Sequence, residues 1–286
     1  MTVKKSKAGI IKYQSKMKSI KIIVFLLFCS ATISAQALKG SIKDTAGEPL
    51  PYVNVGVVGK NIGTVTSEKG TFSLYIPEAN NQDIIRLSMV GYEDLTFKVS
   101  DLRSVLEKNK ELTLRGTITE LKEIVISNRK LKEKILGNKT RSQGTTIAFD
   151  SNKLGNEIGM IMNIKKSPTR IKNFTASLAS KENYPVKLRL NFYSVKNGMP
   201  DKILTNEQII ITAPKDNSLI EVDLDQYDIV VEDDFFVSLE WIETAPGGLI
   251  FSGKLFAKSV IIRDTSQGNW EKPGIMGVGF TCKVAY

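Results

Sequence analysis

Short runs in which apolar and polar residues alternate fill the chain from residue 38 onward, and this period of two limits its fold more than any other feature. In Tyr52–Val58 valine occupies every second position, and Thr71–Ile76 alternates in the same way. The runs between residues 38 and 100 recur roughly every ten residues and are separated by turn-forming clusters. Such spacing predicts a small β-sandwich.

The second half of the chain, from about residue 145, alternates in the same way and contains no segment with helical periodicity. In Phe235–Ile242 two polar residues, Ser238 and Glu240, fall on one face. The other face carries Phe235, Val237, Leu239 and Trp241. One apolar face and one polar face predict a larger antiparallel β-sandwich or jelly roll, so we expect an all-β chain. The predicted strands of this half are 171–178, 186–193, 208–212, 219–224, 235–242, 257–263 and 276–284.

The N-terminus has the features of a secretory signal peptide. Residues 1–35 carry seven lysines and no acidic residue, and the apolar run Ile22–Phe28 is followed by small and polar residues up to Ala35. We expect cleavage near Ala35, with Met17 as an alternative natural start; an uncleaved anchor or a lipoprotein signal at Cys29 is the rival interpretation. The apolar run is shorter than the ~20 residues that a membrane-spanning helix needs. The chain is therefore predicted to be exported, to the periplasm, the outer membrane or the cell surface.

Charge and reactive side chains exclude several functions. The net charge of +10 comes mostly from the signal peptide, because 33 basic and 30 acidic residues remain after it, so no nucleic-acid partner is expected. The chain has no histidine, which excludes Ser-His-Asp and Cys-His catalysis and the common zinc sites. Cys282 has no partner for a disulfide once Cys29 is removed. We predict a protein that is not an enzyme, with no catalytic residue, cofactor or metal.

Several spaced motifs in residues 39–100 resemble the carboxypeptidase regulatory-like domain. They are Gly40–Val55, Gly63–Thr66, Gly70–Phe72 and Gly91-Tyr92. The resemblance implies a small transthyretin-like β-sandwich of the kind found at the N-terminus of bacterial envelope proteins, including TonB-dependent receptors. It implies no peptidase. Glu120–Ser127 also resembles the segment that joins this domain to the plug of such receptors, although the remaining chain is too short for a plug and a large barrel.

The charge pattern then suggests the domain boundaries. Residues 128–144 are basic and rich in turn formers without interleaved aromatic residues, which predicts a solvated linker; a basic patch for an anionic partner is the alternative. The chain is thus divided into a signal peptide (1–35), a regulatory-like β-sandwich (36–127), a basic linker (128–144) and a C-terminal β-sandwich (145–286).

Three groups of residues are candidate sites. Trp270 lies in a turn-rich loop and, with Trp241, is a candidate ligand contact; Trp270 could instead fold back onto the core. Glu240 and Glu243 flank Trp241 and could serve as acid and base in glycoside chemistry, although an edge-facing glutamate is the commoner case. Six carboxylates could bind calcium but are better explained as solvated strand ends. They are Asp223, Asp225, Asp228, Glu232, Asp233 and Asp234.

The function predicted from these features is a non-enzymatic binding, scaffold or accessory module of the cell envelope. The expected partner is an envelope protein or a glycan, with peripheral association with the outer membrane as a further expectation. Two alternatives stay open: a carbohydrate-binding or carboxylate-dependent glycan-active protein, and a small outer-membrane barrel in the C-terminal half. The barrel alternative rests on the alternation from Val278 to the C-terminal Tyr286.

Overall fold

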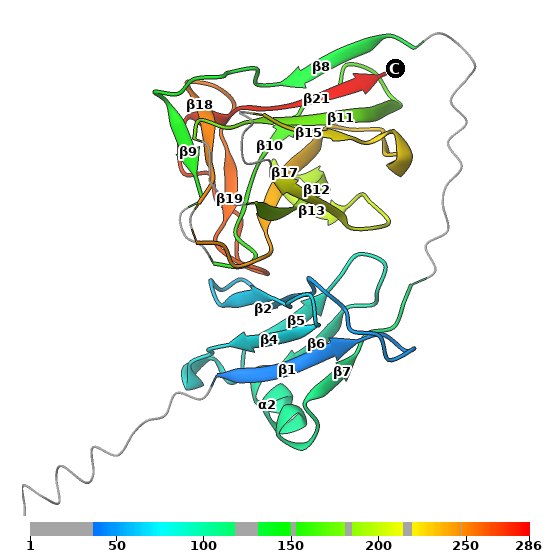
Figure 1. The fold of residues 1–286 in the computed structure, drawn as a ribbon, viewed down its shortest axis with the longest axis vertical. Coiled ribbons are helices and arrows are strands. Elements are labelled where there is room, and N and C mark those ends of the chain that lie inside the picture. The colour runs from blue at the N-terminus through cyan, green and yellow to red at the C-terminus, as the bar shows by residue number, and fades with distance from the viewer. Residues whose placement is uncertain (1–36, 118–130, 150–152, 181–184, 214–218, 247) are drawn as a thin grey trace, which may run out of the picture. The chain divides into compact units, whose positions relative to one another are not determined.

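Strands form most of the chain, as the alternation predicts (Figure 1). The computed structural model describes residues 37–117, 131–149, 153–180, 185–213, 219–246 and 248–286. Within these, Ala37–Tyr286 forms one compact unit that contains two β-sandwiches. The predicted signal peptide and the segment 120–127 lie outside the described residues.

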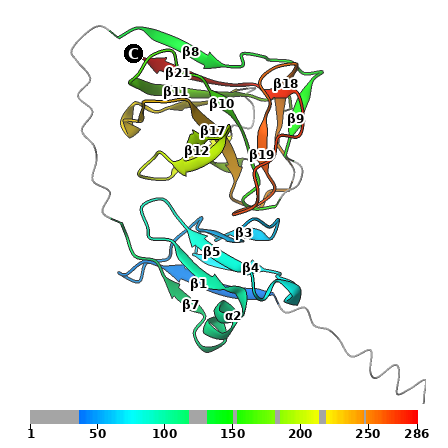
Figure 2. The ribbon, with the colours of Figure 1, turned by 180° about the vertical axis from the view of Figure 1, so that it is seen from behind.

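Two sheets, of strand order β4-β1-β7 and β3-β2-β5-β6, form the N-terminal sandwich (Figures 1 and 2). Their strands are β1 Leu38–Lys43, β2 Asn54–Val57, β3 Gly63–Val65, β4 Thr71–Leu74, β5 Ile84–Ser88, β6 Leu95–Lys98 and β7 Glu111–Thr113, with a 3-10 turn η1 Glu78–Asn80. Val53, Val55 and Val57 are fully buried between the sheets, which confirms the small sandwich that their alternation predicts. The core therefore depends on the period of two.

One helix, α2 Val99–Lys108, follows β6 directly and was not predicted. It buries Val99, Leu102 and Leu106, whose spacing places them on one side of a helix. This side packs against the N-terminal sandwich, where α2 contacts β1 and β6. In the described part of the chain, no helix has the length and hydrophobicity needed to cross a bilayer.

The C-terminal sandwich has two main sheets, of order β13-β12-β17-β10-β19 and β15-β11-β21-β8, and a smaller sheet β20-β18-β9. β14 also pairs with β12, and β16 with β11. The elements are β8 Glu133–Gly137, β9 Thr146–Ala148, β10 Glu157–Met162, β11 Thr169–Ser177, β12 Val186–Lys196, β13 Met199–Ile203, β14 Ile209–Ala213, β15 Leu219–Asp223, η2 Asp225–Tyr227, β16 Val230–Val231, β17 Phe235–Trp241, β18 Ile250–Leu255, β19 Ile261–Arg263, β20 Met276–Val278 and β21 Phe280–Ala285.

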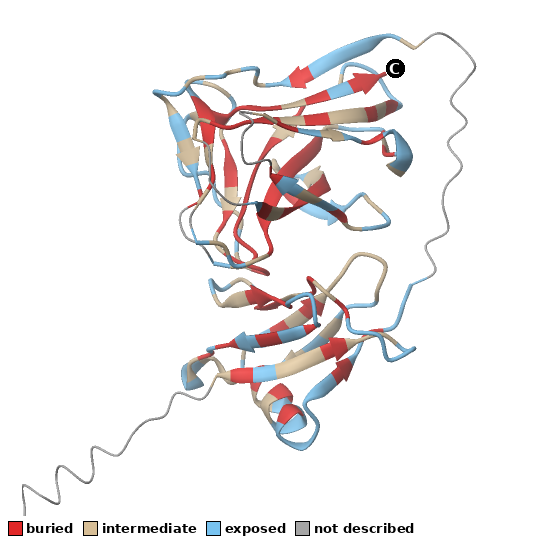
Figure 3. Cartoon of the chain, in the orientation of Figure 1, coloured by how far each residue is buried: buried red, intermediate tan, exposed pale blue. Residues whose placement is uncertain are grey.

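An aromatic-rich core lies between these sheets, and Figure 3 shows buried residues along their strands. Phe280 packs edge to face against Phe174 and Phe251, with ring centroids 5.2 and 5.3 Å apart. Val278, Phe280, Cys282 and Val284, whose alternation also suggested an outer-membrane strand, are fully buried in this core. These side chains therefore do not form the outward apolar band that the membrane alternative requires.

The predicted linker is wrong in part. Residues 133–137, inside the basic segment 128–144, form strand β8 and pair antiparallel with β21. Leu136 is buried in the C-terminal core, while the other four residues of β8 are exposed. One buried apolar side chain was enough for this segment to form an edge strand. The many charged residues of segment 128–144 had led to the prediction of a linker.

The only cysteine in the described residues, Cys282, is fully buried, and its burial raises the pKa of the thiol far above its usual range. A buried, protonated thiol is a poor nucleophile. We therefore expect iodoacetamide to leave Cys282 unmodified in the folded protein and to alkylate it in urea, as measured by mass spectrometry. Rapid alkylation of the folded protein would contradict this placement of β21.

Candidate functional site

A row of four charged residues runs straight across one sheet of the C-terminal sandwich. Arg189 on β12 is the cross-strand partner of Glu240 on β17, Glu240 pairs with Glu157 on β10, and Glu157 pairs with Arg263 on β19. Because the neighbouring residue Trp241 faces the core, the pleat turns these four side chains to the opposite face. All four are at most 8% exposed. We call them the charge row.

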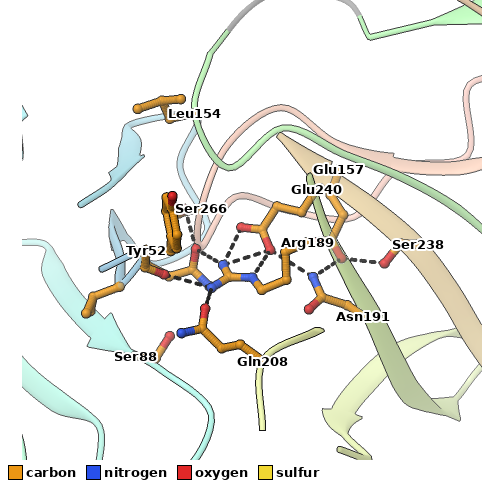
Figure 4. A network of polar contacts seen from close by, with 12 residues as sticks. Tyr52, Ser88, Leu154, Glu157, Arg189, Asn191, Gln208, Ser238, Glu240 and Ser266 are labelled. Carbon is orange, nitrogen blue, oxygen red and sulfur yellow. Dashed lines mark hydrogen bonds and ion pairs between the residues drawn. The ribbon is translucent and has the colours of Figure 1, made fainter. Parts of the chain in front are cut away.

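The Arg189 guanidinium is saturated with hydrogen bonds (Figure 4). Its Nε and Nη2 bind the two Glu240 carboxylate oxygens at 2.9 and 2.8 Å, a bidentate arrangement. Its other donors reach Gln208 Oε1 at 2.6 Å, the Tyr52 carbonyl at 2.7 Å and Asn54 Oδ1 at 2.8 Å. These five acceptors match the five N–H groups of an arginine. Two of them belong to the N-terminal sandwich, so Arg189 joins the two halves.

Glu157 is equally enclosed. Its carboxylate accepts hydrogen bonds from Ser238 Oγ at 2.5 Å, Asn191 Nδ2 at 3.0 Å and Tyr193 Oη at 3.0 Å, and it pairs with Arg263 Nη2 at 2.6 Å. Burial raises the pKa of Glu157, and the neighbouring Glu240 raises it further. The positive charge of Arg263 lowers the pKa of Glu157 in opposition. Burial also raises the pKa of Tyr193 well above its usual value, which keeps this hydroxyl a donor.

The two carboxylates are therefore structural. Asn191 Nδ2 bridges them, at 3.0 Å from Glu157 Oε1 and 2.8 Å from Glu240 Oε2, and each is neutralised by its own arginine. Both glutamates are fully buried, and neither is among the residues that line the cleft described below. A pair of acids held in this way cannot reach a substrate, so the geometry does not support acid–base catalysis here.

Arg263, at the other end of the charge row, keeps a free donor. Its Nε is buried and has no hydrogen-bond partner among the residues that the structure describes. The guanidinium lies over the Trp270 ring at 4.6 Å from the centroid, and the ring packs edge to face against Tyr193 and Phe236. Buried polar atoms are usually satisfied, so this Nε is an exception, while the face of the guanidinium and the Trp270 ring line the cleft.

Close backbone contact joins the halves beside the charge row. Gly56 and Gly63 are partners in the β2–β3 ladder, and a Cβ atom on either would overlap the Ser266 carbonyl oxygen. Only glycine allows the two chains to approach so closely. The Gly59 amide donates to the Gln267 carbonyl at 2.9 Å across the same contact. Ser266 Oγ also donates to Asn54 Oδ1 at 2.8 Å.

A cleft of about 640 Å³ opens at this junction. Its walls come from both sandwiches, and its lining combines amides, hydroxyls, aromatic rings and charged groups of both signs. Lining residues include Asn54, Arg86, Tyr92, Asp94, Arg189, Asn191, Tyr193, Asp201, Lys202, Asn206, Arg263, Gln267, Asn269 and Trp270. A polar cleft of this volume can hold a small ligand or the end of a longer one.

The sequence candidates are distributed unevenly around this cleft. Trp270 packs on Tyr193 and Phe236, as the core interpretation expects, and it also lines the cleft, where its contact with a ligand stays a prediction. Trp241 is fully buried in the C-terminal core, 5.2 Å from Phe149 in an edge-to-face contact, so its ring is not offered to a ligand. Its expected ligand contact is corrected here, because it lies on the apolar face of β17.

The remaining acidic candidates do not converge. Glu243 lies at the surface 3.7 Å from Lys187 and is not part of the charge row with Glu240. In the 223–234 segment, Asp228 pairs with Arg170 at 3.2 Å, and Asp234 accepts the Ile164 amide at 2.9 Å. Within the described ranges, no three carboxylate or thiol groups gather as metal ligands would.

Sequence reasoning missed Glu157 and Arg263 as site residues. Arg189 was not singled out either. The alternation gave the face of each residue correctly, but the pairing of β10 with both β17 and β19 brings together segments far apart in the chain. In the sequence, several strands carry a charged residue on the same face. This pattern predicts that the face is polar, but it does not predict that another sandwich covers it.

Known proteins resemble the N-terminal part of the chain. Residues 38–126 match the family model of the CarboxypepD_reg-like domain, which confirms the resemblance seen in the sequence. The chain is 35% identical over 94 residues to the TonB-dependent receptor SusC of Bacteroides thetaiotaomicron, covering 32% of this chain and 9% of the receptor. It is 30% identical over 120 residues to the TonB-dependent receptor P39 of Formosa agariphila, covering 41% and 11%. The chain thus spans only about a tenth of the length of these relatives.

One solved structure is distantly similar in shape. It contains the cysteine protease and lectin-like domains of Cwp84, a surface layer associated protein of Clostridium difficile. The match has a TM-score of 0.40 and 8% sequence identity, and it covers 82% of this chain and 58% of that chain.

Proposed function

We propose that this chain is a non-catalytic binding module of a bacterial envelope, and that the cleft between its sandwiches holds an oxygen-rich ligand such as a saccharide. The observation that carries the proposal is the pair formed by the Arg263 guanidinium and the Trp270 ring, 4.6 Å apart, in the lining of the cleft. Saccharides present hydroxyl acceptors beside flat apolar ring faces. An arginine can donate hydrogen bonds to the hydroxyl oxygens, and an aromatic ring can pack against the apolar ring face of the saccharide.

The rest of the site favours binding over reaction. The carboxylates that a glycan-active enzyme would need are Glu157 and Glu240, and both are enclosed by their arginines and hydrogen bonds. The cleft is lined by parts of both sandwiches, so a ligand there would contact both. Similarity of the first sandwich to segments of TonB-dependent receptors supports an envelope setting for this role.

Replacing Trp270 with alanine should weaken ligand binding about tenfold, because it removes the ring that supports Arg263 and faces the cleft. Affinity electrophoresis through gels containing a neutral glucan or a uronic-acid polysaccharide measures the retardation. Tyr75→Ala, which removes an aromatic ring that is 54% exposed away from the cleft, is the matched control. Thermal melting of both variants separates lost binding from lost folding. Equal retardation of Trp270→Ala and the unchanged protein would refute the site.

A further inference from the structure

A second surface, far along the chain from the cleft residues of the first sandwich, carries an exposed aromatic residue among lysines. Phe256 follows β18 in a turn and is 83% exposed. Its backbone has a φ of 53°, the left-handed region that bulky residues rarely adopt. The position therefore combines an unfavourable backbone conformation with an apolar ring in water, and contacts within the fold do not account for either.

Neighbouring residues extend this feature into a patch. A hollow of about 510 Å³ is lined by Phe256 together with Ile135 of the edge strand β8, which is 46% exposed. Leu255 and Met276 are the last partners of the β18–β20 ladder, so Phe256 and the 56% exposed Ile275 are the next residues beyond its end. Exposed apolar side chains on neighbouring segments, and not one isolated ring, mark an interaction site.

The charges around Phe256 have one sign. Four exposed lysines line the same hollow: Lys134, Lys165, Lys254 and Lys258. Among the described residues that line it, none is acidic and none is arginine. Asp234 is the acidic group that acts on Lys258, and its carboxylate already accepts hydrogen bonds from Asn163 and the Ile164 amide. We call the patch of Ile135, Phe256 and the four lysines the Phe256 surface.

We propose that the Phe256 surface docks onto an anionic phospholipid bilayer. The net positive charge requires a partner rich in negative charge, and an exposed aromatic ring requires one with an apolar layer beneath that charge. A bilayer containing anionic lipid offers both at the correct depth, because apolar side chains enter at the headgroup boundary while basic side chains stay at the phosphates.

The kind of cation distinguishes a bilayer from an acidic protein. Arginine is enriched and lysine depleted at protein–protein interfaces. Lysine, with its long apolar stem and compact charge, extends along apolar surface toward the polar headgroups. The Phe256 surface has four lysines and no arginine among its described lining residues, which favours lipid. In this arrangement the turn directs the Phe256 ring away from the fold, so that the ring can insert into the bilayer.

Vesicle sedimentation tests this proposal. Residues 37–286, which form one compact unit, are used because the basic and apolar N-terminal segment would bind vesicles by itself. We expect sedimentation with vesicles of phosphatidylcholine and phosphatidylglycerol, little sedimentation with phosphatidylcholine alone, and weaker binding as salt screens the lysines. Equal binding to both vesicle types, or no binding to either, would overturn the proposal. An acidic protein partner predicts the second of these results.

Variants assign the binding to the surface. Phe256→Ala should weaken partitioning about tenfold, since the ring no longer leaves water. Lys254→Gln with Lys258→Gln should weaken it about 25-fold, from roughly fivefold for each lysine near an anionic surface. Tyr75→Ala, and Lys98→Gln with Lys108→Gln, make matched changes on the first sandwich and should have no effect. Trp270→Ala should also bind vesicles normally, so failure of the cleft proposal is distinguishable. Control variants that weaken binding as much as Phe256→Ala would refute this surface.

Discussion

Replacing Arg189 with methionine should reduce the free energy of unfolding by about 3–5 kcal/mol, the range expected when one partner of a buried ion pair is removed. The substitution leaves the Glu240 side chain fully buried and without its bidentate partner. It also leaves the Tyr52 carbonyl and Asn54 Oδ1 without the donor that joins the two sandwiches. Urea unfolding followed by circular dichroism measures the loss.

The double variant Arg189→Met with Glu240→Leu is the control for this first prediction. Removing both charges avoids an uncompensated buried carboxylate, so the double variant should be more stable than Arg189→Met alone. Arg189→Lys should not restore stability, because a lysine has three donors and cannot reproduce the bidentate pair. A loss below about 1 kcal/mol for Arg189→Met would show that the pair is far more hydrated than its burial indicates.

Replacing Gly56 with valine should separate the two sandwiches and cost about 1–3 kcal/mol of overall stability, as expected for overpacking. The new side chain would overlap the Ser266 carbonyl oxygen and press on Gln267 Cβ, 3.0 Å from the position of the added Cβ. Because the clash involves backbone, a rotamer change cannot relieve it. The Gly59 amide, which donates to the Gln267 carbonyl, should then exchange with solvent much faster.

Hydrogen exchange measured by mass spectrometry distinguishes opening of the junction from general unfolding. In Gly56→Val, peptides containing residue 59 should lose protection, while peptides from the C-terminal core around Phe280 should keep it. Gly144→Val is the matched control, because an added Cβ there meets nothing within 4 Å. Unchanged protection of Gly59 in Gly56→Val would contradict the close approach of Gly56 to Ser266.

Local patterns predicted the strands well and the site poorly. Alternation placed Leu239 and Trp241 on the core face of β17 and Glu240 on the other, and the structure confirms this division. A charged residue on an alternating strand usually faces water, so Glu240 was assigned to an edge. Here the first sandwich covers that face, and every residue of β17 is buried. Whether a polar face meets solvent or another sandwich is decided by contacts between distant segments.

The missed elements have similar causes. α2 has three buried apolar residues in ten, and they follow a strand without a capping side chain at Lys98. β8 has one buried residue, Leu136, and its other four residues are exposed. When the local sequence preference is this weak, tertiary packing decides whether a segment forms a helix, a strand or a loop. Conversely, the spaced turn and core motifs of residues 39–100 identified the first sandwich, because several separate motifs matched the same domain at the same time.

The hydrogen bonds across the junction between the two sandwiches limit how either sandwich could be exchanged for another domain in evolution. A regulatory-like sandwich is found in otherwise different proteins, as the two receptors show, which implies that it is readily recombined. In this chain Tyr52 and Asn54 supply acceptors that Arg189 requires, and Gly56 supplies the space that Ser266 requires. Exchanging either sandwich alone would leave buried donors without acceptors. The two halves are therefore expected to be inherited as a pair, with changes at residue 54 constrained by residue 189.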